Sequence, residues 1–332
     1  METHLAEPCL NQSAGRKPFR LAVAQTICRN LPPLVGPRLR TWIYPYVNAL
    51  RDNYPFVVAS HAGIRFQGTT SDPHAYSFSV NGYYDWRNLA IAAAVCHEGD
   101  TIIEVGANVG TETVGFARVV GNKGRVIAFE PSPSNVASLE GTLALNSALR
   151  ITLFPAAVGN VCAKLQFCEP ARRENSGLGH IAATVNEGHS DRIEVDCLTL
   201  DSLADQLGRA RLITIDVEGF EVPVLRGAQS YISDNRPVIV LEATRSHQER
   251  AGYSLQELYD TLTGHDYEVR AVGRLRLTPA DFSETAPGAN WICVHRKERN
   301  AFQRIASTMR IAAFLPGITR LNPILRVAPV CS

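Results

Sequence analysis

Acidic side chains stand directly after three short apolar runs of the chain. Glu130 follows the run 125–129, Asp216 and Glu218 follow the run 212–215, and Glu242 follows the run 237–241. Such runs predict buried strands, and in an open parallel sheet ligands bind beyond the carboxyl ends of the strands. A carboxylate is costly there unless it is paired or used. We therefore predict that these side chains share one crevice; the alternative is that they are helix caps or surface charges.

Residues 99–131 contain a strand, a glycine turn and a helix in succession. The apolar run 101–105 predicts a buried strand, and it leads directly into the turn 106–110, which begins and ends with glycine. Glycine lets the backbone bend sharply and approach a ligand, and the amide groups that open the next helix can receive an anionic group. Glu130 lies 20 residues beyond Gly110, at the tip of the next strand, where a ribose hydroxyl pair binds in doubly wound folds.

The spacing of this turn departs from the dinucleotide fingerprint. That fingerprint places a second glycine two residues after the first, so that a pyrophosphate touches the backbone, and Asn108 occupies this place here. A phosphate-free nucleoside that carries an amino-acid carboxylate fits better, which favours S-adenosylmethionine. A nicotinamide-dependent oxidoreductase is the disfavoured alternative, and an ordinary strand-to-helix turn with a surface Glu is another.

The elements that position these residues alternate between strands and helices. Further strands are predicted at 151–154, 267–272 and 290–295, and helices at 85–96, 132–146, 200–207, 221–232 and 254–263. Shorter alternating stretches at 164–168 and 192–197 predict a β-rich insertion over about 161–198, and 156–160 is expected to pass over the base of the ligand. This alternation predicts one α/β domain over 85–296, a doubly wound, mostly parallel sheet of about seven strands.

The composition is that of an ordinary globular protein. Of 332 residues, 45% are hydrophobic and 20% charged, and the eight cysteines show neither Cys-x-x-Cys pairs nor zinc-binding spacing. The first thirty residues show no secretion signal, and the longest apolar run is too short to span a bilayer. We therefore expect a cytoplasmic protein. Residues 32–73, rich in Pro, Tyr and Trp, are predicted to form an irregular cover that ends in a hairpin of 57–60 with 63–67.

Both ends of the chain are basic, although the total formal charge is +1. Residues 1–51 carry a net +5, residues 296–332 a net +6, and the middle is acidic. The acidic middle argues against a nucleic-acid substrate. Apolar residues between the end charges are typical of segments that lie on an anionic membrane surface, such as the inner membrane face, or on a partner. The alternative is that they pack on the domain. The predicted parts are an N-terminal extension and pocket cover over 1–84, the domain over 85–296, and a basic amphipathic tail over 297–332.

Several motifs together resemble the FkbM family of S-adenosylmethionine-dependent methyltransferases. They are Glu104 to Gly110 (EVGANVG), Ile127 to Pro131 (IAFEP), Leu200 to Leu203 (LDSL), Ile215 to Gly219 (IDVEG), Val224 to Ala228 (VLRGA) and the stretch from Arg236 to Glu242. The resemblance covers about residues 84–272. It implies a Rossmann-like methyltransferase fold, S-adenosyl-L-methionine as cofactor, and O-methylation of a sugar, polysaccharide or natural product. Two positions differ from the family pattern: Glu104 replaces the usual Asp, and Thr214 replaces a common Lys.

The resemblance also implies roles for individual residues. It places the turn from Gly106 through Asn108 to Gly110 against the methionine part of the cofactor and Glu130 against the ribose. The other predicted cofactor-binding residues are Glu104, Thr111, Pro131, Ser132 and Ala157. The reaction would be an in-line methyl transfer to a hydroxyl oxygen, in which positioning supplies about 7 to 11 kcal/mol and a general base about 10²- to 10⁴-fold.

Asp216 and Glu218 are the candidates for binding or deprotonating the acceptor, which is a small molecule or a glycan, and Glu242 supports them. Mg²⁺ held by Asp216 and Glu242 is an alternative for which the sequence shows no further ligand, so no metal site is predicted. His180, His189 and His247 are expected in loops within reach of the pocket, although a lone loop His is more often solvated. A non-catalytic S-adenosylmethionine-binding or scaffold protein is the remaining alternative.

Overall fold

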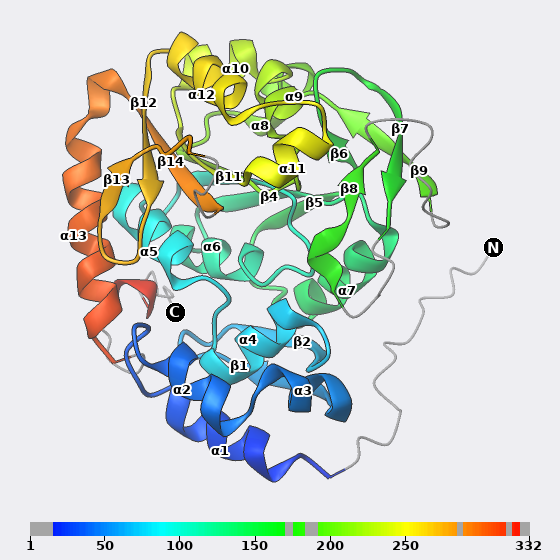
Figure 1. Cartoon of the computed structure of the whole chain (residues 1–332), viewed down its shortest axis with the longest axis vertical. Coiled ribbons are helices and arrows are strands. Elements are labelled where there is room, and N and C mark those ends of the chain that lie inside the picture. Colours follow the sequence, from blue (N-terminus) through cyan, green and yellow to red (C-terminus); the bar gives the residue numbers. More distant parts are fainter. Residues whose placement is uncertain (1–15, 170–174, 183–191, 284–287, 317–320, 326–332) are drawn as a thin grey trace.

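The computed structural model describes residues 16–169, 175–182, 192–283, 288–316 and 321–325. Its centre is an eight-stranded mixed sheet (Figure 1). From one edge to the other its strands are β13 (Leu277–Pro279), β12 (Tyr267–Val272), β14 (Ala289–His295), β11 (Val238–Ala243), β10 (Leu212–Ile215), β3 (Thr101–Val105), β4 (Arg125–Phe129) and β5 (Ile151–Phe154). The sheet has one strand more than predicted, because β13 turns back at Gly273 and pairs antiparallel with β12.

Parallel strands form the half of the sheet that carries the glycine turn. β11, β10, β3, β4 and β5 pair in parallel, with Thr214 opposite both Glu104 and Val240, whereas β14, β12 and β13 pair antiparallel. All four residues of β10 are buried, as are the last four of both β3 and β4. This burial on both faces explains why the sequence shows continuous apolar runs there rather than alternation.

Helices cover both faces of the sheet, as a doubly wound fold requires. One face packs on α5 (Trp86–Val95), α6 (Thr113–Val120) and α13 (Asn300–Phe314). The other packs on α8 (Ala204–Leu207), α9 (Glu221–Arg226), α10 (Gln229–Asn235) and α12 (Leu255–Gly264). Side chains at successive positions enter opposite cores, so that Ile102 faces the first set of helices and Ile103 the second. The predicted doubly wound α/β fold is confirmed.

The predicted helix 221–232 is interrupted. α9 ends at Arg226 and α10 begins at Gln229, because the backbone at Gly227 lies against another segment: a Cβ on Gly227 would stand 1.8 Å from the carbonyl oxygen of Gly159. Two further differences concern the acidic strand ends. Glu242 lies inside β11 rather than beyond it, and the following residues form α11 (Arg245–Arg250), which the sequence did not predict.

A second, four-stranded sheet stands beside the main one and corresponds to the predicted β-rich insertion. Its order is β6 (Ala157–Val158), β9 (Arg192–Leu198), β7 (Ala163–Cys168) and β8 (His180–Ile181). Its apolar core includes Ala157, Phe167 and Val195. A short helical turn, η1 (Ser176–Leu178), precedes β8, and residues 170–174 and 183–191 of the predicted insertion lie outside the described residues.

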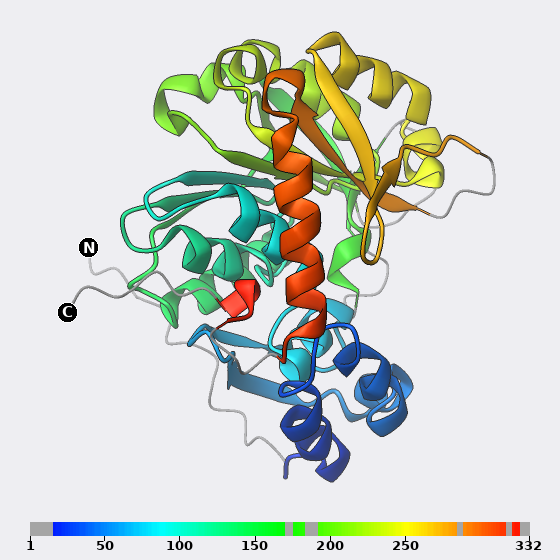
Figure 2. The ribbon, with the colours of Figure 1, turned by 90° about the vertical axis from the view of Figure 1, so that its left-hand side faces the viewer.

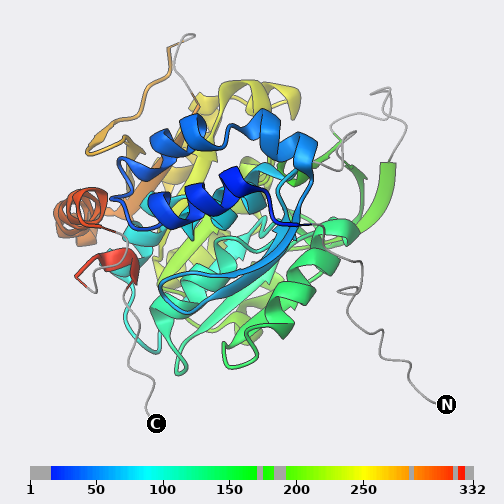
Figure 3. The same ribbon diagram turned by 90° about the horizontal axis from the view of Figure 1, so that it is seen from below.

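The N-terminal region is more helical than predicted. Residues 32–73 contain α2 (Gly36–Ile43) and α3 (Tyr46–Asp52) before the expected hairpin of β1 (Pro55–Ala59) with β2 (Arg65–Thr69). With α1 (Phe19–Cys28) and α4 (Pro73–Asn81) they form a layer beneath the main sheet (Figure 3). Proline explains the difference: Pro37 and Pro45 begin helices, a position where their missing N–H costs nothing.

Helix α13 runs along the side of the domain from the β12–β14 end of the sheet towards the N-terminal helices (Figure 2). It packs against α5 through Phe302, Ile305 and Met309, which are buried, while Ile311 and Phe314 stay exposed. η4 (Pro323–Leu325) lies beside both helices. Within the described ranges, the helices are all too short or too polar to cross a bilayer.

Candidate active site

A cavity of about 360 Å³ opens at the carboxyl ends of β3, β4, β10 and β11. This volume lies in the range of small-molecule sites, and the position is where an open α/β sheet binds its ligand. Two segments that lie far apart in the sequence cover the cavity, the start of α4 and residues 175–181. Asp72 joins them: its Oδ1 accepts from the backbone N–H of Ala75 at 2.7 Å to cap α4, and its Oδ2 accepts from that of Ser176 at 3.1 Å.

The glycine turn after β3 forms the floor of the cavity. Gly106 has φ +88°, and a Cβ there would lie 1.9 Å from the carbonyl oxygen of Asp216, so only glycine fits. Asn108 adopts φ +52°, a left-handed conformation that Asn tolerates better than most residues, and its backbone N–H turns towards Glu130. Asn108, the residue that departs from the dinucleotide fingerprint, therefore has a structural role in the turn, because its backbone N–H binds Glu130.

Glu130 is held inside the cavity wall. Its Oε2 accepts from the backbone N–H of Asn108 at 2.7 Å, and its Oε1 from the backbone N–H of Ser132 at 2.9 Å and the side chain of Asn135 at 3.2 Å. Two carboxylate oxygens offer about four lone-pair positions, so room for a ribose hydroxyl remains. Burial raises the pKa of Glu130 to about 7 although these three donors lower it.

The structure brings most of the predicted cofactor residues to the cavity. Those that line it are Glu104, Gly106, Asn108, Thr111, Glu130, Pro131 and Ala157. Gly110 and Ser132 are not among the lining residues, and their contact with the cofactor stays a prediction. Gly110 packs against Leu139 of α7 (Pro133–Ala144), where a Cβ would meet Leu139 Cδ1 at 2.2 Å, and Ser132 caps α7. Both residues support the turn from behind.

The three candidate catalytic carboxylates also converge on the cavity. Asp216, Glu218 and Glu242 line it. The turn that carries the first two is fixed by Glu221, whose Oε1 accepts from the backbone N–H groups of Val217 at 3.1 Å and Gly219 at 3.4 Å. Burial, reinforced by the charge of Glu242, raises the pKa of Asp216 well above its usual range and that of Glu218 to about 7.

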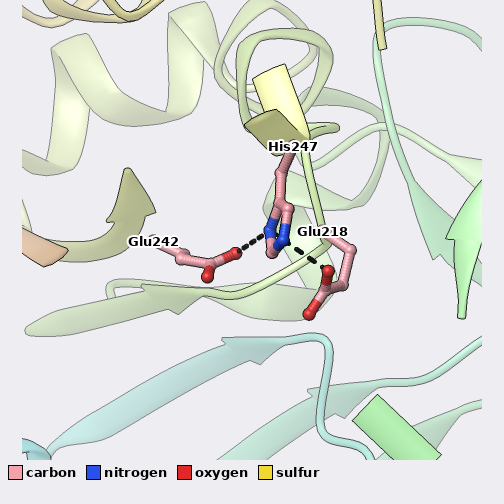
Figure 4. Close-up of side chains that lie close together, drawn as sticks. All are labelled: Glu218, Glu242 and His247. Carbon is pink, nitrogen blue, oxygen red and sulfur yellow. Dashed lines mark hydrogen bonds and ion pairs between the residues drawn. The ribbon is translucent and has the colours of Figure 1, made fainter. Parts of the chain in front are cut away.

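His247 joins this group, from a helix rather than from the expected loop. It lies on α11 with its ring directed between two carboxylates (Figure 4), Nδ1 standing 2.9 Å from Glu242 Oε2 and 3.1 Å from Glu218 Oε2. The hydrogen bond to Glu242 raises the pKa of His247. His180 lies in β8 at the cavity, and His189 lies outside the described residues.

Some cavity residues were not predicted. Glu112 stands at the start of α6 and accepts from Asn88 Nδ2 at 3.0 and 3.1 Å through its two oxygens; burial holds its pKa well above the usual range. His74 and Tyr84 stack at the cavity wall with ring centroids 4.2 Å apart. The sequence signal for Glu112 was its place two residues after the glycine turn, whereas the N-terminal residues carry no recognisable motif.

Six acidic side chains line the cavity, and its described lining contains no Lys or Arg. Burial raises the pKa of Glu104 to about 8, with the charge of Glu130 adding to the effect. Crowded carboxylates favour a ligand that brings positive charge. S-adenosylmethionine fits on this ground, because it carries a sulfonium and an ammonium group, and because the cavity offers a glycine floor and a ribose-side carboxylate.

A mixed, doubly wound sheet whose parallel half carries this turn and this carboxylate fits the class of S-adenosylmethionine-dependent methyltransferases with a Rossmann-like fold. Residues 104–269, half of the chain, match the methyltransferase FkbM domain. The chain belongs to this family, and S-adenosyl-L-methionine is its cofactor. The nicotinamide-dependent alternative is therefore set aside.

Several solved structures are similar to this chain at low identity. The methyltransferase FkbM from Methylobacillus flagellatus KT has 16% identity and a TM-score of 0.41, covering 77% of this chain and 60% of that one. An O-methyltransferase from Thermotoga maritima has 15% identity and a TM-score of 0.36, covering 75% and 81%. Aeropyrum pernix fibrillarin in complex with S-adenosyl-L-methionine has 14% identity and a TM-score of 0.36, covering 62% and 73%. This chain thus spans 60% of the length of the Methylobacillus protein.

Proposed function

We propose that this protein transfers a methyl group from S-adenosylmethionine to a hydroxyl oxygen of a small-molecule or glycan acceptor. The observation that carries the proposal is the convergence of Asp216, Glu218 and Glu242 on the cavity that the cofactor residues line. A base works best when its pKa lies near the working pH, and the pKa of Glu218 is raised to about 7.

The bound cofactor supplies an electrophilic methyl group. The turn 106–110 would hold its amino-acid end and Glu130 its ribose, which would position the methyl group for transfer. Glu218 or Asp216 accepts the hydroxyl proton as the oxygen is methylated. The cover formed by α4 and residues 175–181 limits water at the reacting centre and shapes the acceptor site.

The test has a binding part and a transfer part. S-adenosylmethionine binding is measured by calorimetry on the purified chain, and we expect Glu130→Ala to weaken it by about 10- to 150-fold, since a hydrogen bond to a charged group contributes about 1.5 to 3 kcal/mol. Transfer is followed by mass spectrometry as the gain of one deuterated methyl group on glycans and metabolites extracted from the source cells.

Glu218→Gln and Asp216→Asn are the transfer variants, and Glu249→Gln, an exposed acid on α11, is the matched control. At least one transfer variant should lose about 10²- to 10⁴-fold in kcat while it keeps its affinity for the cofactor. Cofactor binding without any methylated product across the extracts would instead favour a non-catalytic binding or scaffold role. Labelling of nitrogen or carbon would refute O-methylation.

A further inference from the structure

We infer that Glu218, Glu242 and His247 form a binding site for an octahedral divalent cation. Each residue offers one ligand atom, and these three atoms all lie within 4.8 Å of one another. They come from three separate segments, the turn after β10, the end of β11 and helix α11, which meet only in the folded chain (Figure 4). Carboxylates suit Mn²⁺ and imidazole suits other divalent first-row metals, so this mixed donor set fits a divalent transition-metal ion, for which Mn²⁺ is the probe.

The distances in the cluster fit octahedral coordination. An octahedron with metal–ligand bonds of about 2.1 Å has edges of about 3.0 Å. His247 Nδ1 stands 2.9 Å from Glu242 Oε2 and 3.1 Å from Glu218 Oε2, which are two such edges. The three side chains therefore need to move little to bind a cation. The cation would take the place of the proton that His247 Nδ1 shares with the carboxylates.

The surrounding charges leave the site negative. Arg250 is the one cation recorded against the cluster among the described residues, with its Nη2 3.6 Å from Glu218 Oε2. With His247 neutral and both glutamates ionised, the two carboxylates and Arg250 sum to one negative charge. Thr244 Oγ1 donates to Glu242 Oε1 at 2.9 Å and so orients that carboxylate, leaving Oε2 towards His247.

The cation would have open coordination positions on the cavity side, because Glu218 and Glu242 both line the cavity. A hydroxyl that occupies one of them loses its proton more easily, and Asp216 is placed to receive that proton. This part of the inference rests on the proposed O-methylation, whereas the binding site itself rests on the geometry alone.

The test is a titration of the full chain with Mn²⁺ at neutral pH, followed by the electron paramagnetic resonance signal of the free ion. We expect the wild type to bind one Mn²⁺. His247→Ala and Glu242→Gln should each weaken binding at least 10-fold, since even outer partners of a metal ligand contribute that much. Glu249→Gln, on the same helix but exposed, should bind as the wild type does.

Absence of stoichiometric Mn²⁺ binding by the wild type, or unchanged affinity in Glu242→Gln, would overturn the inference. Thermal unfolding and cofactor affinity, measured without metal, show that each variant is folded. The two proposals fail separately: Mn²⁺ binding without methyl transfer would refute the function and keep the site, whereas transfer that is unaffected by a chelator, together with no Mn²⁺ binding, would refute the site alone.

A second inference rests on a different surface, the outer face of α1, α2 and α3. Phe19 is 81% exposed, Trp42 84% and Val47 70%. Residues 16–51 contain seven Lys or Arg and no Asp or Glu, and the exposed ones are Arg16, Lys17, Arg20, Arg38 and Arg51. The three helices lie together on the underside of the molecule (Figure 3), and we call this surface the basic helical face.

The exposed apolar residues of these helices do not belong to the hydrophobic core. The inner sides of the same helices are filled by Leu21, Cys28 and Tyr44, which pack against α4. The end of α13 extends the face, since the backbone N–H of Leu34 donates to the carbonyl of Ala313 at 3.1 Å and the next residue, Phe314, is 58% exposed. The two basic ends of the sequence therefore adjoin in the folded chain.

We propose that the basic helical face docks on an anionic lipid surface. Trp and Phe side chains stand among Arg and Lys on these helices, whose one carboxylate, Asp52 of α3, is partly buried and lies 3.6 Å from Arg51; this matches the aromatic and basic composition of interfacial helices. Each Lys or Arg near such a surface contributes about 5-fold in affinity, so five exposed ones suffice for measurable binding. A neutral apolar partner would leave these basic side chains without a counter-charge, whereas an anionic lipid surface supplies one.

Co-sedimentation with vesicles tests this proposal. We expect the full chain to bind vesicles of phosphatidylcholine with 30% phosphatidylglycerol, to release them at high salt, and to ignore pure phosphatidylcholine. Phe19→Ala with Trp42→Ala should weaken binding at least 10-fold, whereas Val161→Ala, an exposed apolar residue elsewhere, should not. The proposal is overturned if the wild type binds both vesicle types equally, or if the double variant binds as the wild type does. It is also overturned if the wild type self-associates and the double variant is monomeric, because the face would then bind a second copy of the chain.

Discussion

Glu104→Gln should stabilise the protein without ligand, and more so as the pH rises. Glu104 is 4% exposed on β3, and its pKa is raised to about 8 by burial. Between about pH 4.5 and pH 8 the folded chain therefore keeps a proton that the unfolded chain has lost, so the free energy of unfolding falls as the pH rises through this window. Glutamine is neutral throughout and escapes this loss.

The magnitude follows from the shift in pKa. One pKa unit corresponds to about 1.4 kcal/mol, so the stabilisation by Glu104→Gln is about 1 kcal/mol at pH 5 and about 4 kcal/mol at pH 8. Unfolding entropy of about 2.1 cal/mol/K per residue, over 332 residues, converts the latter to about 6 °C in Tm. The same variant should bind S-adenosylmethionine more weakly, because a carboxylate expected to face the cofactor is lost.

Thermal unfolding by calorimetry from pH 5 to pH 8, on the protein without cofactor, measures this effect. Glu140→Gln is the matched control, because Glu140 is exposed on α7 and its replacement should change stability by less than about 0.5 kcal/mol at every pH. The reasoning is refuted if Glu104→Gln has the same Tm as the wild type at pH 8, or the same dependence of Tm on pH.

Two further substitutions test the packing. Gly106→Ala should abolish cofactor binding and lower stability by more than about 2 kcal/mol, because its Cβ would stand 1.9 Å from the carbonyl oxygen of Asp216 at φ +88°. Cofactor binding and Tm are both measured by calorimetry. Wild-type values for the variant would contradict the described geometry of the turn. Ile305→Ala, fully buried between α13 and α5, should cost about 2 to 5 kcal/mol, whereas Ile311→Ala, 50% exposed on the same helix, should cost less than about 0.5 kcal/mol in denaturant unfolding. Equal costs would mean that α13 does not pack as described.

The doubly wound sheet was predictable because its signals are local. Continuous apolar runs such as 101–105 and 212–215 are dictated by burial on both faces, and each ends in the residue that reaches the cavity. Glu130 and Asp216 follow β4 and β10, the two strands that flank β3, so both reach the cavity. The β-rich insertion was also visible, since its strands alternate between buried and exposed positions.

What escaped prediction depends on contacts between distant segments. The break at Gly227 is required by the carbonyl of Gly159, nearly seventy residues away. His247 had no periodic pattern around it, and only the fold places α11 against Glu218 and Glu242. Likewise, the contact of Gly110 with Leu139 and the capping of α7 by Ser132 could not be predicted from the residue types alone.

The ring of carboxylates around the cavity has a consequence for turnover. Six acids, with no Lys or Arg in the described lining, attract a positively charged sulfonium more strongly than a neutral thioether, so this attraction would weaken once the methyl group has left the sulfur. The charge of the cavity wall would thereby favour the methylated cofactor over the demethylated one.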